Sequence, residues 1–259
     1  MMPFILFALI ASIMVYALWW MRNPGTKSRK VQQAPEQLAA MLEAEVHYYK
    51  KLDADKKQSF AQRVQGFLEA VKITGIKTEV TDTDKVLLGA SAIIPIFAFP
   101  NWTYPNLDEI LVYPDTFDDA FSQSGAERSI AGMVGDGPMN NKMVISQFHL
   151  RQDFLNNTGK GNTAIHEFVH LVDKSDGSTD GVPEVLIRQP YVMPWLELIH
   201  QKVADILKRK SDINPYGATN QAEFFAVASE YFFERPDLLR EKHPELYQAL
   251  SEIFAQEQA

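Results

Sequence analysis

The chain has no cysteine among its 259 residues, which excludes disulfides, thiolate metal ligands and a cysteine nucleophile. Any metal site must therefore use histidine, aspartate or glutamate. Acidic side chains outnumber basic ones outside the first 30 positions. The formal charge is −8, and residues 1–30 carry four basic side chains and no acidic one, so the remainder carries about −12. A body this acidic is a poor binder of nucleic acid, and we expect no nucleic-acid partner.

Charged side chains are absent from residues 1–21. About 20 helical residues span the ~30 Å hydrocarbon core of a bilayer, so this segment predicts a transmembrane helix. Trp19 and Trp20, at its end, are typical of a membrane interface. Residues 22–35 form a basic linker rich in proline, glycine and polar residues. Because the nearby positive charges all follow the helix, the sequence predicts a single-pass protein of the cell inner membrane or plasma membrane, with its body facing the cytoplasm.

The remaining residues, 36–259, are predicted to form one folded domain. Hydrophobic periodicity predicts helices over 36–52, 54–71, 86–99, 195–207 and 220–233 and from 244 onward. Strands are predicted over 110–113 and 143–150. The fold class is therefore α+β, with many helices and a small sheet ahead of the helix described next.

The sequence His166-Glu-Phe-Val-His170 lies on a predicted helix, 163–174, with Asn162 as its N-cap. Residues four apart lie one turn above each other, so both imidazoles point to one place and Glu167 projects beside them. This spacing predicts a catalytic zinc site, in which three protein ligands leave one coordination position open. Glu167 would then take a proton from the attacking water.

The residues alone do not identify the third zinc ligand. Asp176 lies six residues after His170, but this offset requires a sharp glycine turn, and Asp173 occupies the position where that glycine would stand. The other candidates are Glu223 and Glu230, seven residues apart on an otherwise apolar helix. Carboxylates on such a helix are costly to bury unless they are paired or bind a metal.

Two segments resemble one known family. His166-Glu-Phe-Val-His-Leu-Val-Asp173 and the stretch from Asn214-Pro-Tyr-Gly to Phe233 are similar to the Mlc titration factor A family of zinc peptidases, as is Leu111-Val-Tyr-Pro114. The resemblance implies a zincin fold related to the catalytic domain of anthrax lethal factor. It also implies one zinc per chain, held by His166, His170 and Glu223, with Glu167 as general base and Tyr216 stabilising the oxyanion.

Two carboxylates that do not bind the metal are candidates for orienting its imidazole ligands through hydrogen bonds. Asp173 matches the family pattern one turn after His170, where it could accept from an imidazole N–H. Glu230 is the second such candidate.

These features lead to two functional hypotheses. The first is a membrane-anchored zinc metallopeptidase that hydrolyses peptide or protein substrates, with the aminopeptidase preference that the resemblance implies. The second is a zinc-containing binding protein that sequesters a transcriptional regulator. Retention of Glu167 favours the enzyme, because a structural zinc site needs no general base.

Overall fold

The structure, a computed structural model, describes residues 36–258 apart from 124–127, 136, 157 and 188. The predicted anchor over 1–21 and linker over 22–35 lie outside the described residues, so the domain boundaries stay predictions. No helix within the described part of the chain is long and apolar enough to cross a membrane.

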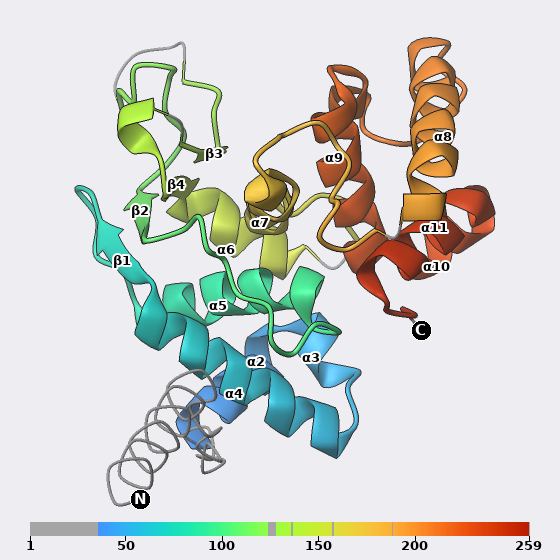
Figure 1. The fold of residues 1–259 in the computed structure, drawn as a ribbon. Coiled ribbons are helices and arrows are strands. Elements are labelled where there is room, and N and C mark those ends of the chain that lie inside the picture. Colours follow the sequence, from blue (N-terminus) through green and yellow to red (C-terminus); the bar gives the residue numbers. More distant parts are fainter. Residues whose placement is uncertain (1–35, 124–127, 136, 157, 188, 259) are drawn as a thin grey trace, which may run out of the picture. The chain divides into compact units, whose positions relative to one another are not determined.

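Helices dominate the fold, and the sheet is small (Figure 1). Along the described chain the elements are α2 (Glu36–Glu45), α3 (His47–Lys50), α4 (Ala54–Ala70), β1 (Lys72–Gly75), α5 (Asp82–Ile96), β2 (Glu109–Tyr113), β3 (Gly132–Val134), η1 (Gly137–Met139), β4 (Lys142–Ser146), α6 (Gln147–Leu155), α7 (Thr163–Asp173), η2 (Lys174–Asp176), α8 (Gln189–Leu207), η3 (Pro215–Ala218), α9 (Gln221–Glu234), α10 (Pro236–Lys242) and α11 (Pro244–Phe254), where η marks a short 3-10 helix. The predicted helix-rich α+β class is confirmed.

The four strands form a mixed sheet in the order β1-β2-β4-β3. β1, β2 and β4 run parallel, and β3 pairs antiparallel to β4 at one edge. In β4 the consecutive residues Met143, Val144 and Ile145 are all buried, because Val144 packs in a separate small cluster on the opposite face. Both faces of the sheet are therefore covered.

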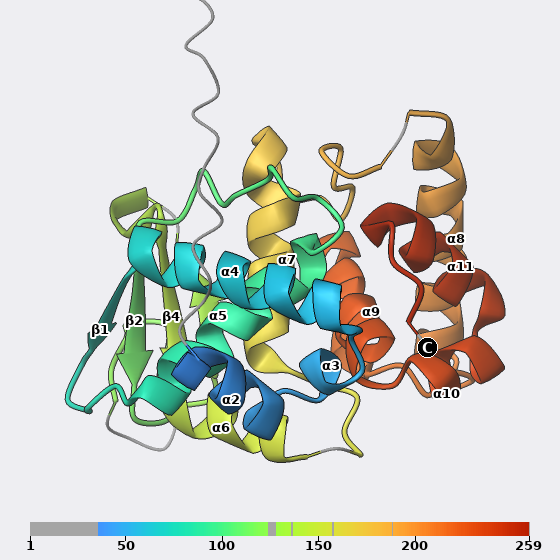
Figure 2. The same cartoon turned by 90° about the horizontal axis from the view of Figure 1, so that it is seen from below.

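α7 lies between the sheet and α9 in both views of the fold (Figures 1 and 2). It contacts α5 and α9 along its length. Phe168, Val169, Leu171 and Val172 are completely buried, so α7 is fixed by packing on most of its surface. The remaining side chains of α7 are consequently held in place by a rigid support.

Polar side chains cap the N-terminal ends of the central helices. Asn162 Oδ1 accepts from the Ile165 amide at the start of α7, and Asn220 Oδ1 accepts from the Glu223 amide at the start of α9. At α5 Thr81 and Asp84 form a reciprocal capping box. These caps supply partners for backbone N–H groups that a helix leaves unbonded at its beginning.

Two predictions about local structure were wrong. The helix predicted over 36–52 is broken into α2 and α3, because Val46 adopts an extended backbone. The strand predicted over 143–150 ends at Ser146, whose hydroxyl accepts from the His149 amide and begins α6 instead. Phe148 is consequently exposed rather than sharing a buried face with Val144. The Ser146 N-cap begins a helix at this point, although the alternation of apolar residues over 143–150 had predicted a strand.

Candidate functional site

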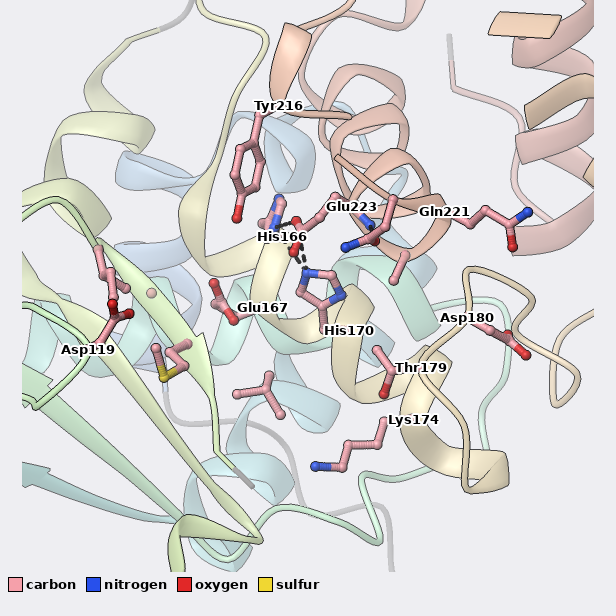
Figure 3. Close-up of a pocket in the computed structure, with 16 residues that line it drawn as sticks. Asp119, His166, Glu167, His170, Lys174, Thr179, Asp180, Tyr216, Gln221 and Glu223 are labelled. Atoms are coloured by element: carbon pink, nitrogen blue, oxygen red, sulfur yellow. Dashed lines mark hydrogen bonds and ion pairs between the residues drawn. The ribbon is translucent and has the colours of Figure 1, made fainter. Parts of the chain in front are cut away.

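α7 brings two imidazoles together on the side that faces a cleft (Figure 3). His166 and His170 lie one turn apart, and their Nε2 atoms are 3.1 Å apart. Both side chains are about nine-tenths buried, so the surrounding residues limit their rotamers. The predicted helix over 163–174 is present with its predicted N-cap, and its α-helical part ends at Asp173.

α9 brings a carboxylate to the same point. Glu223 Oε2 lies 3.0 Å from His166 Nε2 and 3.4 Å from His170 Nε2. Within the described residues, these three side chains are the group whose ligand atoms converge closely enough to hold a metal ion. We call His166, His170 and Glu223 the front cluster.

The front cluster has the dimensions of a zinc site. Tetrahedral ligands about 2.0–2.1 Å from zinc lie roughly 3.3–3.4 Å from one another. The three separations of 3.0, 3.1 and 3.4 Å are close to that value. One carboxylate oxygen and two imidazole nitrogens, all electron-rich when the imidazoles are neutral, are a donor set that zinc prefers. The residues present therefore fit zinc.

A second group of carboxylates, Asp153, Glu230 and Glu234, lies behind the imidazoles at the N-terminal end of α7. We call these residues the rear cluster. Glu230 Oε1 lies 2.6 Å from His166 Nδ1, and its Oε2 accepts from the Asn162 amide. Asp153 Oδ2 accepts from the Thr163 amide, and Glu234 Oε1 accepts from the Asn162 side chain. The rear cluster thus bonds both to the helix start and to one ring of the front cluster.

Burial changes the acidity of the rear cluster. It raises the pKa of Glu234 to about 7 and also raises the pKa of Asp153. Hydrogen bonds from neighbouring donors reduce the effect at both residues but do not reverse it. At neutral pH a substantial part of Glu234 is therefore protonated.

Hydrogen bonding outweighs burial in the front cluster. Burial disfavours the charged form of His166, but hydrogen bonds to Glu223 and Glu230 raise the pKa of this imidazole well above its usual value. Burial likewise opposes ionisation of Glu223, yet hydrogen bonds from both imidazoles lower its pKa to about 2. Glu223 is consequently an anion throughout the physiological pH range.

Glu167 of α7 is buried beside the front cluster, and its side chain packs against β3. Burial raises the pKa of its carboxyl group, although the nearby imidazoles oppose the shift. A Cβ added at Gly132 of β3 would stand 2.7 Å from Glu167 Cγ and Oε1. The absence of a side chain at Gly132 therefore lets β3 pack directly against the Glu167 carboxylate.

Tyr216 extends over the front cluster from η3 (Figure 3). Its ring centroid is 6.1 Å from that of His166, and about half of the residue's surface is exposed. Asn214 Oδ1 accepts from its backbone N–H, so the turn that the sequence suggested is present as well. Burial and the carboxylates of Glu223 and Glu167 raise the pKa of the phenol, which keeps it a hydrogen-bond donor.

Two candidate carboxylates bond elsewhere. Asp173 was predicted to accept from an imidazole, but its Oδ2 accepts from the Gly181 amide instead. Its Oδ1 and His170 Nδ1 are both buried without a hydrogen-bond partner in the structure, so the expected direct bond is absent. Asp176 accepts from the amides of Ser178 and Glu184 and is not in the converging group. Both carboxylates fix the loop after α7.

The cleft in front of the cluster has a volume of about 740 Å³. Its walls include residues that no sequence motif indicated, among them Asp119, Gly132, Lys174, Thr179, Asp180 and Gln221. These residues come from four separate parts of the chain, near positions 119, 132, 174–180 and 221, and no local pattern connects those parts.

Comparison with known proteins agrees with this geometry. Residues 18–255 match the family described as "Glucose-regulated metallo-peptidase M90". The chain is 29% identical to an uncharacterised protein of Synechocystis over 98% of this chain and 95% of that protein. It is 27% identical to "Mlc titration factor A" of Pectobacterium atrosepticum, over 80% of this chain and 81% of that protein. It is 28% identical to the protein of the same name in Serratia proteamaculans, over 63% of this chain and 66% of that protein.

Proposed function

Because the chain belongs to the glucose-regulated metallo-peptidase M90 family, we propose that it is a zinc-dependent peptidase that hydrolyses peptide bonds in the cleft beside α7. The observation that carries the proposal is the convergence of His166, His170 and Glu223 on one point, with a separate carboxylate, Glu167, beside them. A purely structural zinc site would require neither the open cleft nor a separate carboxylate such as Glu167.

In the proposed reaction His166, His170 and Glu223 hold the zinc. The bound metal would supply a Lewis acid that polarises the substrate carbonyl and brings the pKa of water near 7. Glu167 accepts the proton of the attacking water and then delivers it to the leaving amine. Burial raises the pKa of this carboxyl group, which makes Glu167 a stronger base than an exposed glutamate.

Two residues assist without taking the proton. The Tyr216 phenol donates a hydrogen bond to the carbonyl oxygen as negative charge develops there. Glu230 accepts from His166 Nδ1, which keeps Nε2 free of a proton and aimed at the metal. Asp173 is not part of this proposed machinery.

The substrate is a peptide lying along β3. This strand is one of the two edges of the described sheet, and it lines the cleft with Gly132, Met133 and Val134. An extended peptide can add to such an edge through main-chain hydrogen bonds. The proposal includes the aminopeptidase preference that the family resemblance implies, which a comparison of free and acetylated N-termini on one peptide series tests.

The proposal also includes attachment to a membrane. Residues 1–21 form the single-pass anchor, and the positive charges of residues 22–35 keep the catalytic body in the cytoplasm. A reporter fused after residue 259 should be active in the cytoplasm. Activity only on the other side of the membrane would reverse the orientation and leave the zinc chemistry untouched.

A second candidate function rests on the names of the relatives. Several are called "Mlc titration factor A", which supports a metal-containing binding protein that sequesters a transcriptional regulator. Such a protein would bind its partner with the same affinity whether or not Glu167 is present.

One experiment separates the two functions. Full-length, zinc-loaded protein is incubated with a mixture of unstructured peptides, and the products are identified by mass spectrometry. We expect hydrolysis, with Glu167→Gln retaining one zinc per chain and losing about 10²–10⁴-fold in turnover, because only the proton acceptor is removed. Undiminished turnover by Glu167→Gln would remove Glu167 from the mechanism. No turnover by the zinc-loaded wild type would favour the binding protein.

A further inference from the structure

A second cavity, of about 860 Å³, lies between α8 and α11. It shares no lining residue with the metal cleft. Its floor consists of the buried or half-buried side chains of Leu186, Ile187, Trp195, Leu198 and Ile253. We call it the α8–α11 groove.

Three exposed apolar side chains lie between positions 185 and 193, and one of them, Tyr191, is in the groove. Tyr191 lines it and is 48% exposed, and Met193 and Val185 on the same segment are 63% and 40% exposed. Apolar side chains gathered on the surface of a soluble domain mark sites where another molecule binds. The segment therefore has the composition of an interface rather than of ordinary surface.

The groove carries charge of one sign. Glu197, Glu245 and Glu252 line it, and among the lining residues that the structure describes there is no lysine, arginine or histidine. All three glutamates are exposed. Lys202, at 3.7 Å from Glu245, is the ion-pair partner found for this residue in the described structure. A ligand that combines apolar groups with positive charge is complementary to this surface.

The walls also restrict the shape of that ligand. Most lining residues belong to α8 and α11, whose backbone groups are already paired within each helix. None of the described residues that line the groove belongs to a strand, so they offer a peptide no sheet edge to extend. Recognition must occur through side chains, as when an amphipathic helix lies in a groove with anchors at positions i, i+3, i+4 and i+7.

We propose that the α8–α11 groove binds an amphipathic helix of a protein partner, with the apolar face in the groove and flanking lysines or arginines against Glu197, Glu245 and Glu252. This goes beyond the peptidase function and does not depend on it. The groove and the cleft are joined by one loop: Thr179 and Asp180 line the cleft, and Leu186 and Ile187 line the groove. A bound partner would therefore be held beside the catalytic cleft.

The test uses full-length protein and a synthetic 16-residue helical peptide with leucine on one face and lysine on the other. Two control peptides carry glutamate in place of lysine, or the same residues with the leucines scattered. The groove variant is Glu197→Gln/Glu245→Gln/Glu252→Gln. The matched variant, Glu36→Gln/Glu45→Gln/Glu69→Gln, removes equal charge from exposed positions on α2 and α4. Calorimetry gives the affinities, and a photoreactive leucine in the peptide locates the site.

We expect one lysine-leucine peptide to bind per chain, to cross-link to α8 or α11, and to bind roughly tenfold or more weakly to the groove variant than to the matched variant. Equal weakening in both variants, equal binding of the glutamate peptide, or cross-links elsewhere would overturn the proposal. So would self-association that the groove variant abolishes, since a second copy would then be the occupant. Zinc content and hydrolysis, measured on the same variants, report separately on the peptidase proposal.

Discussion

The carboxylates on the two sides of the imidazole pair have different bonding partners. At the front, Glu223 Oε2 and two imidazole nitrogens converge within 3.4 Å, facing a cleft. At the rear, Asp153 and Glu230 each accept a backbone N–H, and Glu234 accepts a side-chain amide. The front cluster consists of two histidines and a glutamate, and the rear cluster consists of three carboxylates. The rear carboxylates bond to donors at the start of α7 and to His166. The three ligand atoms of the front cluster instead converge on one point, which fits a cation.

The front cluster and the rear cluster should therefore have different roles. The front cluster should determine whether metal binds and whether hydrolysis occurs. The rear cluster should determine how well one ligand is oriented and how the fold responds to pH. Substitutions on the two sides test this distinction. Those at the front should change zinc binding and hydrolysis, and those at the rear should change ligand orientation and the pH dependence of stability.

The largest effect is expected from removing a front ligand. His166→Ala, His170→Ala or Glu223→Ala leaves two protein ligands, too few for a catalytic zinc site, and should abolish tight zinc binding. Asp176→Ala should retain zinc, because this carboxylate bonds to the loop amides of Ser178 and Glu184. Competition with one chelator across the four variants measures the affinities. Loss of zinc from Asp176→Ala together with retention by Glu223→Ala would place the third ligand in the loop.

A smaller effect is expected at the cleft mouth. Tyr216→Phe should keep zinc and lower kcat by about 10²–10³-fold with little change in KM, because the phenol bonds to charge that develops in the transition state. Steady-state kinetics on one unstructured peptide gives both constants. An increase in KM at constant kcat would show that Tyr216 contacts the substrate equally before and during the reaction.

Removing the rear support of His166 should have a more moderate effect. Glu230→Gln takes away the anion 2.6 Å from His166 Nδ1, and we expect zinc affinity to fall by about 10–100-fold while the chain stays folded. Glu234→Gln is the matched control, since Glu234 bonds to Asn162 and not to an imidazole. Equal loss of affinity in both variants would mean that the rear cluster acts only through the start of α7.

The smallest effect concerns stability and pH. Glu234 releases its proton near pH 7 in the folded chain and near its ordinary value of 4.5 when unfolded. Between these values the folded state binds more protons, so the free energy of unfolding falls as pH rises. Glu234→Gln should remove roughly 1–3 kcal/mol of this fall. Urea unfolding at pH 5 and pH 8 measures it, and an unchanged difference between the two pH values would contradict the raised pKa.

The front side was predictable from the sequence to a greater extent than the rear. His166, Glu167 and His170 are separated by helical spacing, and the Asn162 and Asn220 caps that orient α7 and α9 are also local signals. Asp153 could not be assigned, because it lies on α6, which begins within a stretch predicted as a strand. The approach of Gly132 to Glu167 depends on the pairing of β3 with β4, which no spacing in the sequence specifies.

Gly181 limits how the loop after α7 can change. Its amide donates to Asp173, its carbonyl accepts from Trp195 Nε1, and it adopts φ +79°. An added Cβ would stand 2.4 Å from the Gln221 carbonyl oxygen, two residues before Glu223. In a library of all single substitutions, position 181 should therefore tolerate almost no replacement. Its intolerance would match that of the metal-binding histidines, although Gly181 contributes no atom to the reaction.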